Sequence, residues 1–284
     1  MSDVPYAEAE LERQYNPRVA VPDYQDKVAD RAELSARARR LLTCHEDLRY
    51  GDGPKETVDI FPAAHPGAPV QVYFHGGYWR ANDKSEVGFV AVPLVQAGAC
   101  VVLANYDLCP TVTLDELVAE TRRCIAWCYR RISEWGGDPE RIFVSGSSAG
   151  GHIAAMLIAH DWAADGLPED VIKGATLITG VYDAEPVLHI SLNEEIRLDA
   201  GSARRLSPIN HLPRRALPLV VAVGGAETAA WIQMSRNYSQ ACRAAGVPNE
   251  YMELPGEDHF TMTGRLADAE GPLVPVILRQ MGLG

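Results

Sequence analysis

The chain has 284 residues and a formal net charge of −12 at pH 7. This charge disfavours nucleic acid and anionic membranes as partners, because both are bound through basic faces. Hydrophobic residues make up 47% of the sequence and charged residues 23%, which is typical of a globular protein. The length allows two domains, but it also suits one α/β domain with insertions.

Targeting signals and cysteines exclude further classes of protein. Residues 1–13 are acidic and polar and lack the apolar stretch of a signal peptide. No apolar run approaches the roughly 18 residues that a membrane-spanning helix needs. The six cysteines form no C-x-x-C pair and have no histidine at metal-ligand spacing. We therefore expect a cytoplasmic protein with free thiols and no metal ion or cofactor.

In chain order, residues 1–45 predict an N-terminal arm of two polar helices, with a proline-containing break between them at Asn16-Pro17 and Val21-Pro22. Residues 46–284 predict an α/β domain, in which short apolar runs alternate with helical stretches. These runs are mostly continuous, which is typical of strands buried on both faces of a mainly parallel sheet with helices on both sides. The predicted strands are Thr57–Phe61, Val70–Phe74, Ala99–Ala104, Arg141–Ser145, Ala175–Thr179, Leu219–Gly224 and Glu250–Leu254.

Two segments between these strands have a distinct pattern. Thr113–Trp135 carries an apolar stripe at helical spacing, and Thr113 with Glu116 matches a capping box. Residues 182–213 contain three prolines and no strong period. We expect residues 182–213 to form a small cap over one end of the sheet.

A candidate nucleophile lies in the pentapeptide Gly146-Ser147-Ser148-Ala149-Gly150, a G-x-S-x-G motif. A predicted strand precedes it and a helical stretch follows it. In this context a nucleophilic serine is presented on a sharp turn, which identifies Ser148. The backbone N–H of Ala149 would then donate to an oxyanion. The alternative is a glycine-rich helix start or an anion-binding turn without a catalytic role.

A second glycine motif, His75-Gly76-Gly77-Tyr78-Trp79, directly follows a predicted strand. A tetrahedral intermediate needs two backbone N–H donors, and glycines let the backbone approach closely enough. Gly76 and Gly77 are therefore candidates for the oxyanion hole, together with Ala149 of the G-x-S-x-G motif. We expect His75 to anchor this loop rather than to act as a base.

The remaining members of a triad should follow the serine in the order acid, histidine. His259 comes after the last predicted strand and is the candidate base, with His189 and His211 in the predicted cap as alternatives. Glu227 follows the preceding strand and is the favoured acid, because glutamate serves this role on such folds. Asp183 is the alternative acid. No H-E-x-x-H motif or Cys/His cluster supports a metal-dependent route.

These residues resemble the α/β-hydrolase fold and, within it, the kynurenine formamidase (arylformamidase) group of the hormone-sensitive-lipase-like esterases. The resemblance covers nearly the whole chain. The segments that carry it are Glu10–Pro17, His75–Trp79, Ser145–His152 and Tyr182–Pro186. Two features depart from the group: its acid is usually aspartate, where this chain has Glu227, and its triad histidine is usually followed by an aromatic and an acidic residue, where this chain has Phe260 and Thr261.

The resemblance implies hydrolysis of an N-formyl aryl amide, with N-formylkynurenine as the type substrate, and it allows a homodimer. Tyr78, Trp79, Trp231 and Phe260 could wall a pocket for the aromatic leaving group. The alternative for each aromatic side chain is ordinary core packing.

A substrate carboxylate would need a local basic anchor in this acidic protein, for which we consider Arg80 or Arg197. The alternative functions are a carboxylesterase or amidase acting on another small ester, carbamate or amide, and a binding protein without catalysis. In each case we expect a small molecule as the partner.

Overall fold

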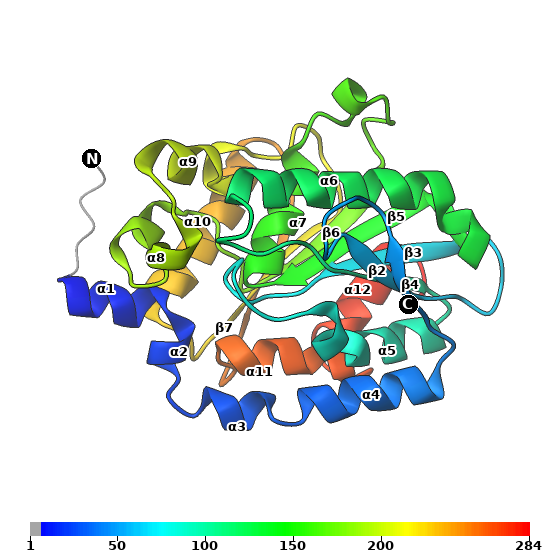
Figure 1. Ribbon diagram of the computed structural model, residues 1–284, viewed down its shortest axis with the longest axis horizontal. Helices are drawn as coiled ribbons and strands as arrows, with labels where there is room; N and C mark the ends of the chain where they lie inside the picture. Colours follow the sequence, from blue (N-terminus) through cyan, green and yellow to red (C-terminus); the bar gives the residue numbers. More distant parts are fainter. Residues whose placement is uncertain (1–6) are drawn as a thin grey trace.

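The computed structural model describes residues 7–284, so the first six residues of the predicted arm lie outside the described residues (Figure 1). Within that range the strands form one eight-stranded sheet in the order β1-β2-β4-β3-β5-β6-β7-β8. The pairs β1/β2 and β2/β4 are antiparallel and the other pairs are parallel. The predicted mainly parallel sheet is confirmed. The strands are β1 (His45–Arg49), β2 (Thr57–Phe61), β3 (Ala68–Phe74), β4 (Cys100–Ala104), β5 (Gly137–Ser147), β6 (Ile172–Ile178), β7 (Leu219–Gly224) and β8 (Glu250–Leu254).

The helices connect these strands and cover both faces of the sheet. The α-helices are α1 (Glu8–Tyr15), α2 (Pro17–Ala20), α3 (Tyr24–Val28), α4 (Arg31–Leu41), α5 (Ala91–Gln96), α6 (Leu114–Arg131), α7 (Ala149–Ala159), α8 (Asn193–Ile196), α9 (Ala200–Arg205), α10 (Ala229–Ala244), α11 (His259–Gly264) and α12 (Val274–Met281). The 3-10 helices are η1 (Lys84–Val90), η2 (Ile132–Trp135), η3 (Trp162–Asp165), η4 (Glu185–His189), η5 (Pro208–Asn210) and η6 (Arg265–Ala267). None of the described helices is long and apolar enough to cross a membrane.

The sheet separates two hydrophobic cores, because successive side chains of a strand point to opposite faces. On β3, Val72 and Phe74 belong to the core under α6, α7 and α10, whereas Tyr73 belongs to the core under α5, α11 and α12. All seven residues of β3 are buried. This double burial explains why the central strands are continuous apolar runs.

Strand β1 was not among the predicted strands. It has the sequence His-Glu-Asp-Leu-Arg, and four of its five residues are exposed. It lies at the edge of the sheet and pairs only with β2. A polar edge strand carries no apolar pattern, so its sequence does not distinguish it from a loop.

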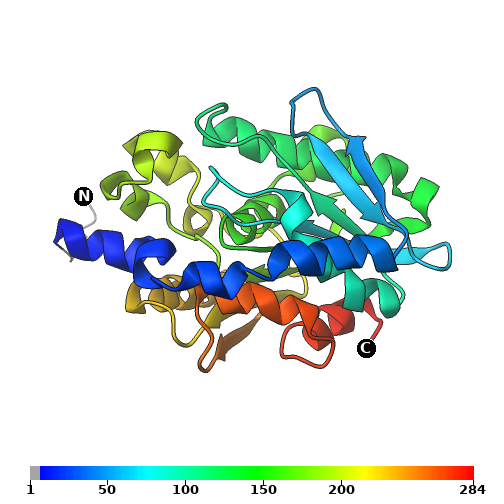
Figure 2. The ribbon, with the colours of Figure 1, turned by 60° about the horizontal axis from the view of Figure 1, so that its bottom comes forward.

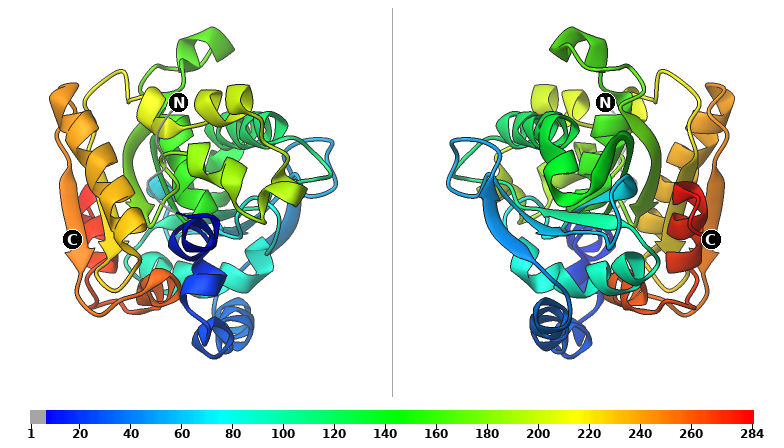
Figure 3. Two further views of the ribbon diagram at one scale, coloured as in Figure 1. Left: turned by 90° about the vertical axis from the view of Figure 1, so that its left-hand side faces the viewer. Right: turned by 90° about the vertical axis from the view of Figure 1, so that its right-hand side faces the viewer.

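The predicted arm folds as α1–α4 and runs as a band along one side of the molecule (Figure 2). Helix α4 packs on η1 and α3 packs on α11, whereas α1 contacts η4 and α10. Figure 3 shows that α3 and α4 lie outside the layer formed by α5 and α11. The arm therefore contacts both the cap and the C-terminal part of the chain.

Residues 182–213 contain η4, α8, α9 and η5, which lie beside one end of the sheet (Figure 1). The loops that follow β3, β5, β7 and β8 are at the carboxyl ends of parallel strands. In open α/β sheets this edge is where ligands bind. The favoured candidates Ser148, Glu227 and His259 lie in these loops or at the start of the helices that follow, whereas the alternatives Asp183, His189 and His211 lie after β6 or in the cap.

Candidate active site

Ser148 occupies the turn between β5 and α7 with φ 57° and ψ −118°, a conformation that residues other than glycine rarely adopt. Its N–H donates to the carbonyl of Ile178 at 2.9 Å, and its own carbonyl accepts from His152 at 3.0 Å. A Cβ added to Gly150 would lie 1.9 Å from the carbonyl oxygen of Phe74, so only glycine fits where α7 meets β3. Such a strained turn is typical of functional sites.

The ring of His259 donates from Nδ1 to Oε2 of Glu227 at 2.7 Å. The other carboxylate oxygen of Glu227 accepts from the backbone N–H of Gly224 at 2.9 Å. Both side chains are nearly inaccessible to solvent, with exposed fractions of 8% and 2%. The bond at Nδ1 fixes the tautomer in which Nε2 carries a lone pair and can accept a proton.

The alternative acid Asp183, and Asp258, which precedes His259 in the chain, have other partners. Asp183 accepts from the N–H of Glu185 at 3.0 Å and lines a separate cavity with Tyr182. Asp258 accepts from the N–H groups of Phe260 and Thr261 and caps α11. Glu227, not Asp183, is therefore the carboxylate that orients the imidazole in this structure.

The glycine loop after β3 packs directly on the serine turn. A Cβ on Gly76 would lie 2.9 Å from the carbonyl oxygen of Ser147 and 3.2 Å from the Cβ of Ser148. Gly77 has φ +127°, and a Cβ there would lie 2.0 Å from the carbonyl oxygen of Ala81, so this position requires glycine. Ala149 begins α7, where the first backbone N–H groups have no partner inside the helix.

His75 anchors the glycine loop through contacts of its ring and its backbone carbonyl. Its ring is fully buried and stacks on Tyr106 with centroids 4.4 Å apart. Its two ring nitrogens contact Oδ1 of Asn105 at 3.0 Å and the carbonyl oxygen of Gly76 at 2.7 Å. Burial lowers the pKa of His75. The hydroxyl of Tyr106 donates to the His75 carbonyl at 2.6 Å, which holds the backbone of the loop.

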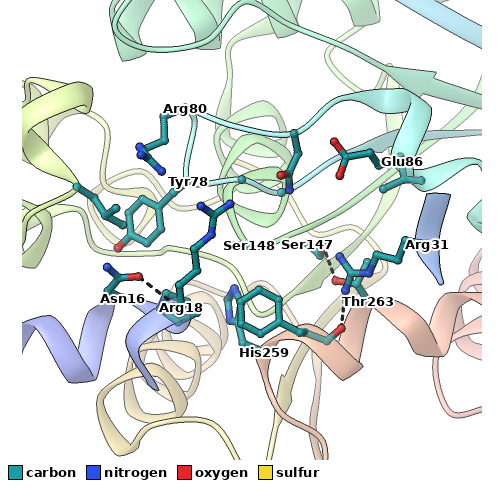
Figure 4. Close-up of a pocket in the computed structure, with 17 residues that line it drawn as sticks. Asn16, Arg18, Arg31, Tyr78, Arg80, Glu86, Ser147, Ser148, His259 and Thr263 are labelled. Carbon is teal, nitrogen blue, oxygen red and sulfur yellow. Dashed lines mark hydrogen bonds between the residues drawn. The ribbon is translucent and has the colours of Figure 1, made fainter. Parts of the chain in front are cut away.

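A cavity lies between the serine turn, the glycine loop, His259 and the arm (Figure 4). Helix α2, the start of α4, the glycine loop, η1, the cap and α11 all contribute to its wall. The lining residues are Asn16, Pro17, Arg18, Arg31, Gly76, Gly77, Tyr78, Arg80, Asn82, Glu86, Val87, Ser147, Ser148, Leu192, His259, Phe260 and Thr263. Within residues 7–284, no group of three or more His, Cys, Asp and Glu side chains could hold a metal ion.

The structure divides the four predicted aromatic side chains. Tyr78 and Phe260 line the cavity, and the Tyr78 hydroxyl donates to the carbonyl of Tyr15 at 2.9 Å. Trp79 and Trp231, which the sequence also offered for this wall, are not among the described residues that line the cavity. The Trp79 indole is fully buried and donates to Nδ1 of His152 at 3.1 Å, so its place is in the core.

Trp231 lies behind His259, with ring centroids 4.6 Å apart at 78°. Its indole N–H donates to the carbonyl of Thr179 at 3.0 Å, and only 2% of the residue is exposed. Trp231 thus supports the imidazole from the side away from the cavity lined by Ser148. This packing is the alternative that the sequence left open for the aromatic residues.

The basic residues differ from the expectation as well. Arg80 lines the cavity and forms an ion pair with Glu195 of the cap, whereas Arg197 is exposed and does not line the cavity. Arg18 and Arg31 of the arm do line it, and the sequence analysis missed both. The segment Glu10–Pro17 ends next to Arg18, but no local pattern reveals that the arm folds over the site.

The comparisons with known proteins agree with this geometry. Residues 71–263 match the family described as alpha/beta hydrolase fold, and the chain belongs to this family. It is 33% identical to kynurenine formamidase of Danio rerio and 32% identical to kynurenine formamidase of Salmo salar, over 96% of each chain. It is also 32% identical to Esterase LipQ of Mycobacterium tuberculosis, over 86% of this chain and 65% of that protein.

Two solved structures extend the likeness. A candidate thioesterase from Silicibacter sp. TM1040 has a TM-score of 0.84 at 28% identity, covering 94% of this chain and 98% of that one. An esterase from Pyrobaculum calidifontis has a TM-score of 0.71 at 18% identity, covering 100% and 98%, and this likeness shows the fold alone. The predicted hydrolase fold and the resemblance to kynurenine formamidases are thereby confirmed.

Proposed function

We propose that the protein is a serine hydrolase that cleaves N-formyl aryl amides of the N-formylkynurenine type to an arylamine and formate. The observation that carries the hydrolase assignment is the 2.7 Å hydrogen bond between His259 and Glu227 beside the cavity that Ser148 lines. The substrate class is supported by the likeness to kynurenine formamidases over 96% of both chains, because this likeness includes the arm that completes the cavity.

In the proposed reaction, the Ser148 hydroxyl attacks the formyl carbon while Nε2 of His259 takes its proton. Glu227 stabilises the imidazolium that forms. The N–H of Ala149, with that of Gly76 or Gly77, stabilises the oxyanion. The C–N bond then breaks, and His259 gives its proton to the leaving arylamine. Water, deprotonated by His259, attacks the formyl ester and releases formate from Ser148.

The close packing around Ser148 supports a small acyl group. The glycine loop lies so near the serine turn that a methyl group on Gly76 would contact the Cβ of Ser148 at 3.2 Å. A formyl group carries only a hydrogen on its carbon and needs almost no acyl pocket. The part of the cavity that Tyr78 and Phe260 line would then receive the aromatic leaving group.

The test compares kcat/KM for N-formylkynurenine and for p-nitrophenyl acetate in wild-type protein, Ser148→Ala and Ser133→Ala. Ser133 is an exposed serine of η2, so its variant controls for loss of a hydroxyl away from the site. We expect the formamide to be preferred and Ser148→Ala to lose activity on both substrates. Full activity in Ser148→Ala would refute the serine mechanism, and a preference of several decades for the ester would refute the formamide substrate.

The alternative is an esterase acting on another small ester, and the likeness to Esterase LipQ favours it. The same serine, histidine and glutamate would serve both reactions, so the triad does not separate them. A dominant activity on p-nitrophenyl acetate in the comparison above would select this alternative.

A further inference from the structure

Three arginines line the cavity of a protein whose net charge is −12, namely Arg18, Arg31 and Arg80. The Nε atoms of Arg31 and Arg80 are buried and have no hydrogen-bond partner among the described residues. A buried N–H group without an acceptor is costly, and a charged group more so. Two such groups around one cavity indicate that an acceptor binds there.

The charges around the cavity do not cancel. Arg80 forms an ion pair with Glu195 of the cap. Glu86 also lines the cavity, and burial together with Asp83 raises its pKa. Of the described residues that line the cavity, three are arginines and one, Glu86, is a carboxylate.

Arg18 is more accessible than Arg31. It is exposed, and its guanidinium lies 5.4 Å from the centre of the Tyr24 ring. In the part of the chain that the structure describes, no carboxylate forms an ion pair with it. Figure 4 shows its side chain rising from α2 into the space between Tyr78 and Glu86.

Arg31 is fixed in place from the other side. Its Nη2 donates to the carbonyl of Phe260 at 2.6 Å, so the guanidinium is tied to the residue next to His259. Burial lowers the pKa of Arg31, yet a guanidinium stays protonated in proteins. A bound anion would offset the cost of burying this charge.

We propose that Arg18 and Arg31 form an anion subsite through which the arm selects substrates that carry a carboxylate on their leaving group. Arginine suits this role because its planar fork matches the two oxygens of a carboxylate. In its choice of substrate the proposal rests on the proposed function. It adds that the arm, not the sheet edge, distinguishes charged from neutral substrates.

The test uses Arg18→Gln, Arg31→Lys and the control Arg197→Gln, with two formamides. N-formylkynurenine carries the carboxylate, and N-formylkynuramine keeps the ketone and amine but lacks it. We expect Arg18→Gln to lower kcat/KM for the carboxylate substrate roughly tenfold, mainly through KM, because a hydrogen bond to a charged group is lost. Activity on N-formylkynuramine should stay within twofold, and Arg197→Gln should match wild type on both.

Arg31→Lys keeps the charge and loses the fork, so it should lower the preference for the carboxylate substrate less than Arg18→Gln does. Equal losses on both formamides would overturn the subsite, since they would mean that the arm acts only on folding or on the chemical step. An unchanged preference in Arg18→Gln would overturn it as well.

A second pair of substrates separates this proposal from the proposed function. If wild-type protein cleaves esters but neither formamide, the function fails, and the same variants are compared on 3-acetoxybenzoate and 3-acetoxybenzamide. A preference for the benzoate that Arg18→Gln removes would support the subsite in an esterase. Equal rates on the two esters in wild-type protein would overturn it.

Discussion

Replacing Glu227 by glutamine tests the catalytic assignment most directly, because both carboxylate oxygens have a defined partner. Oε1 accepts from the N–H of Gly224, and Oε2 accepts from Nδ1 of His259. A glutamine has only one acceptor oxygen. If this oxygen stays with Gly224, the amide NH2 faces Nδ1, and the imidazole must carry its proton on Nε2, where it cannot accept a proton from Ser148.

If the amide instead turns its oxygen to His259, its NH2 faces the Gly224 N–H and one buried donor loses its partner, at a cost of about 1–3 kcal/mol. In addition, the imidazolium of the transition state loses a charge-assisted bond worth about 1.5–3 kcal/mol. A total near 4 kcal/mol corresponds to a fall in kcat of about a thousandfold. KM should change little, because the interaction is lost only in the transition state.

The assay is steady-state hydrolysis of the preferred substrate by Glu227→Gln, with Glu253→Gln as the control on an exposed glutamate of β8. Thermal unfolding checks that the variant is folded. A kcat within threefold of wild type would refute the role of Glu227. A large loss in Asp183→Asn together with that result would transfer the role to the alternative acid.

Two further variants test the surroundings of the site. Gly76→Ala should lower kcat at least tenfold without unfolding the protein, because its Cβ would lie 2.9 Å from the carbonyl of Ser147 and displace the oxyanion loop; an unchanged kcat would contradict this. Burial raises the pKa of the Glu120 carboxyl to about 7. The folded protein therefore keeps a proton on Glu120 that the unfolded chain loses as the pH rises above about 4.5. The contribution of Glu120 to stability falls as a result between pH 5 and 8. In Glu120→Gln, the fall in the free energy of unfolding between pH 5 and pH 8 should be about 2 kcal/mol smaller than in wild type, as measured by urea titrations at both pH values. An identical pH dependence in the two proteins would contradict this prediction.

The sequence predicted those parts of the fold that depend on local pattern. The buried strands were found because burial on both faces requires continuous apolar runs, and the turn at Ser148 was found because only small residues fit around it. Strand β1 was missed because it is polar and exposed.

The cavity wall was predicted less well, because it depends on how distant segments pack. Tyr78 and Trp79 both have positive φ values, 52° and 60°. With this backbone conformation the Tyr78 ring lines the cavity, whereas the Trp79 ring lies in the core. The sequence of the His75–Trp79 motif does not determine where either ring points. Arg18 and Arg31 reach the site through the packing of the arm, which leaves no signal near either residue.

The contact between Arg31 and Phe260 joins residues that are 229 positions apart in the chain. Lys27 of α3 also forms an ion pair with Asp258 at 3.2 Å. Helix α3 therefore docks on a segment that is synthesised much later than α3 itself. Contacts of such separation form late, after a large loss of chain entropy. During synthesis the arm therefore cannot form these contacts until the sheet and α11 have been made. The cavity therefore becomes complete only when α11 has been made, because Phe260 and His259 of its wall belong to that helix or its first turn.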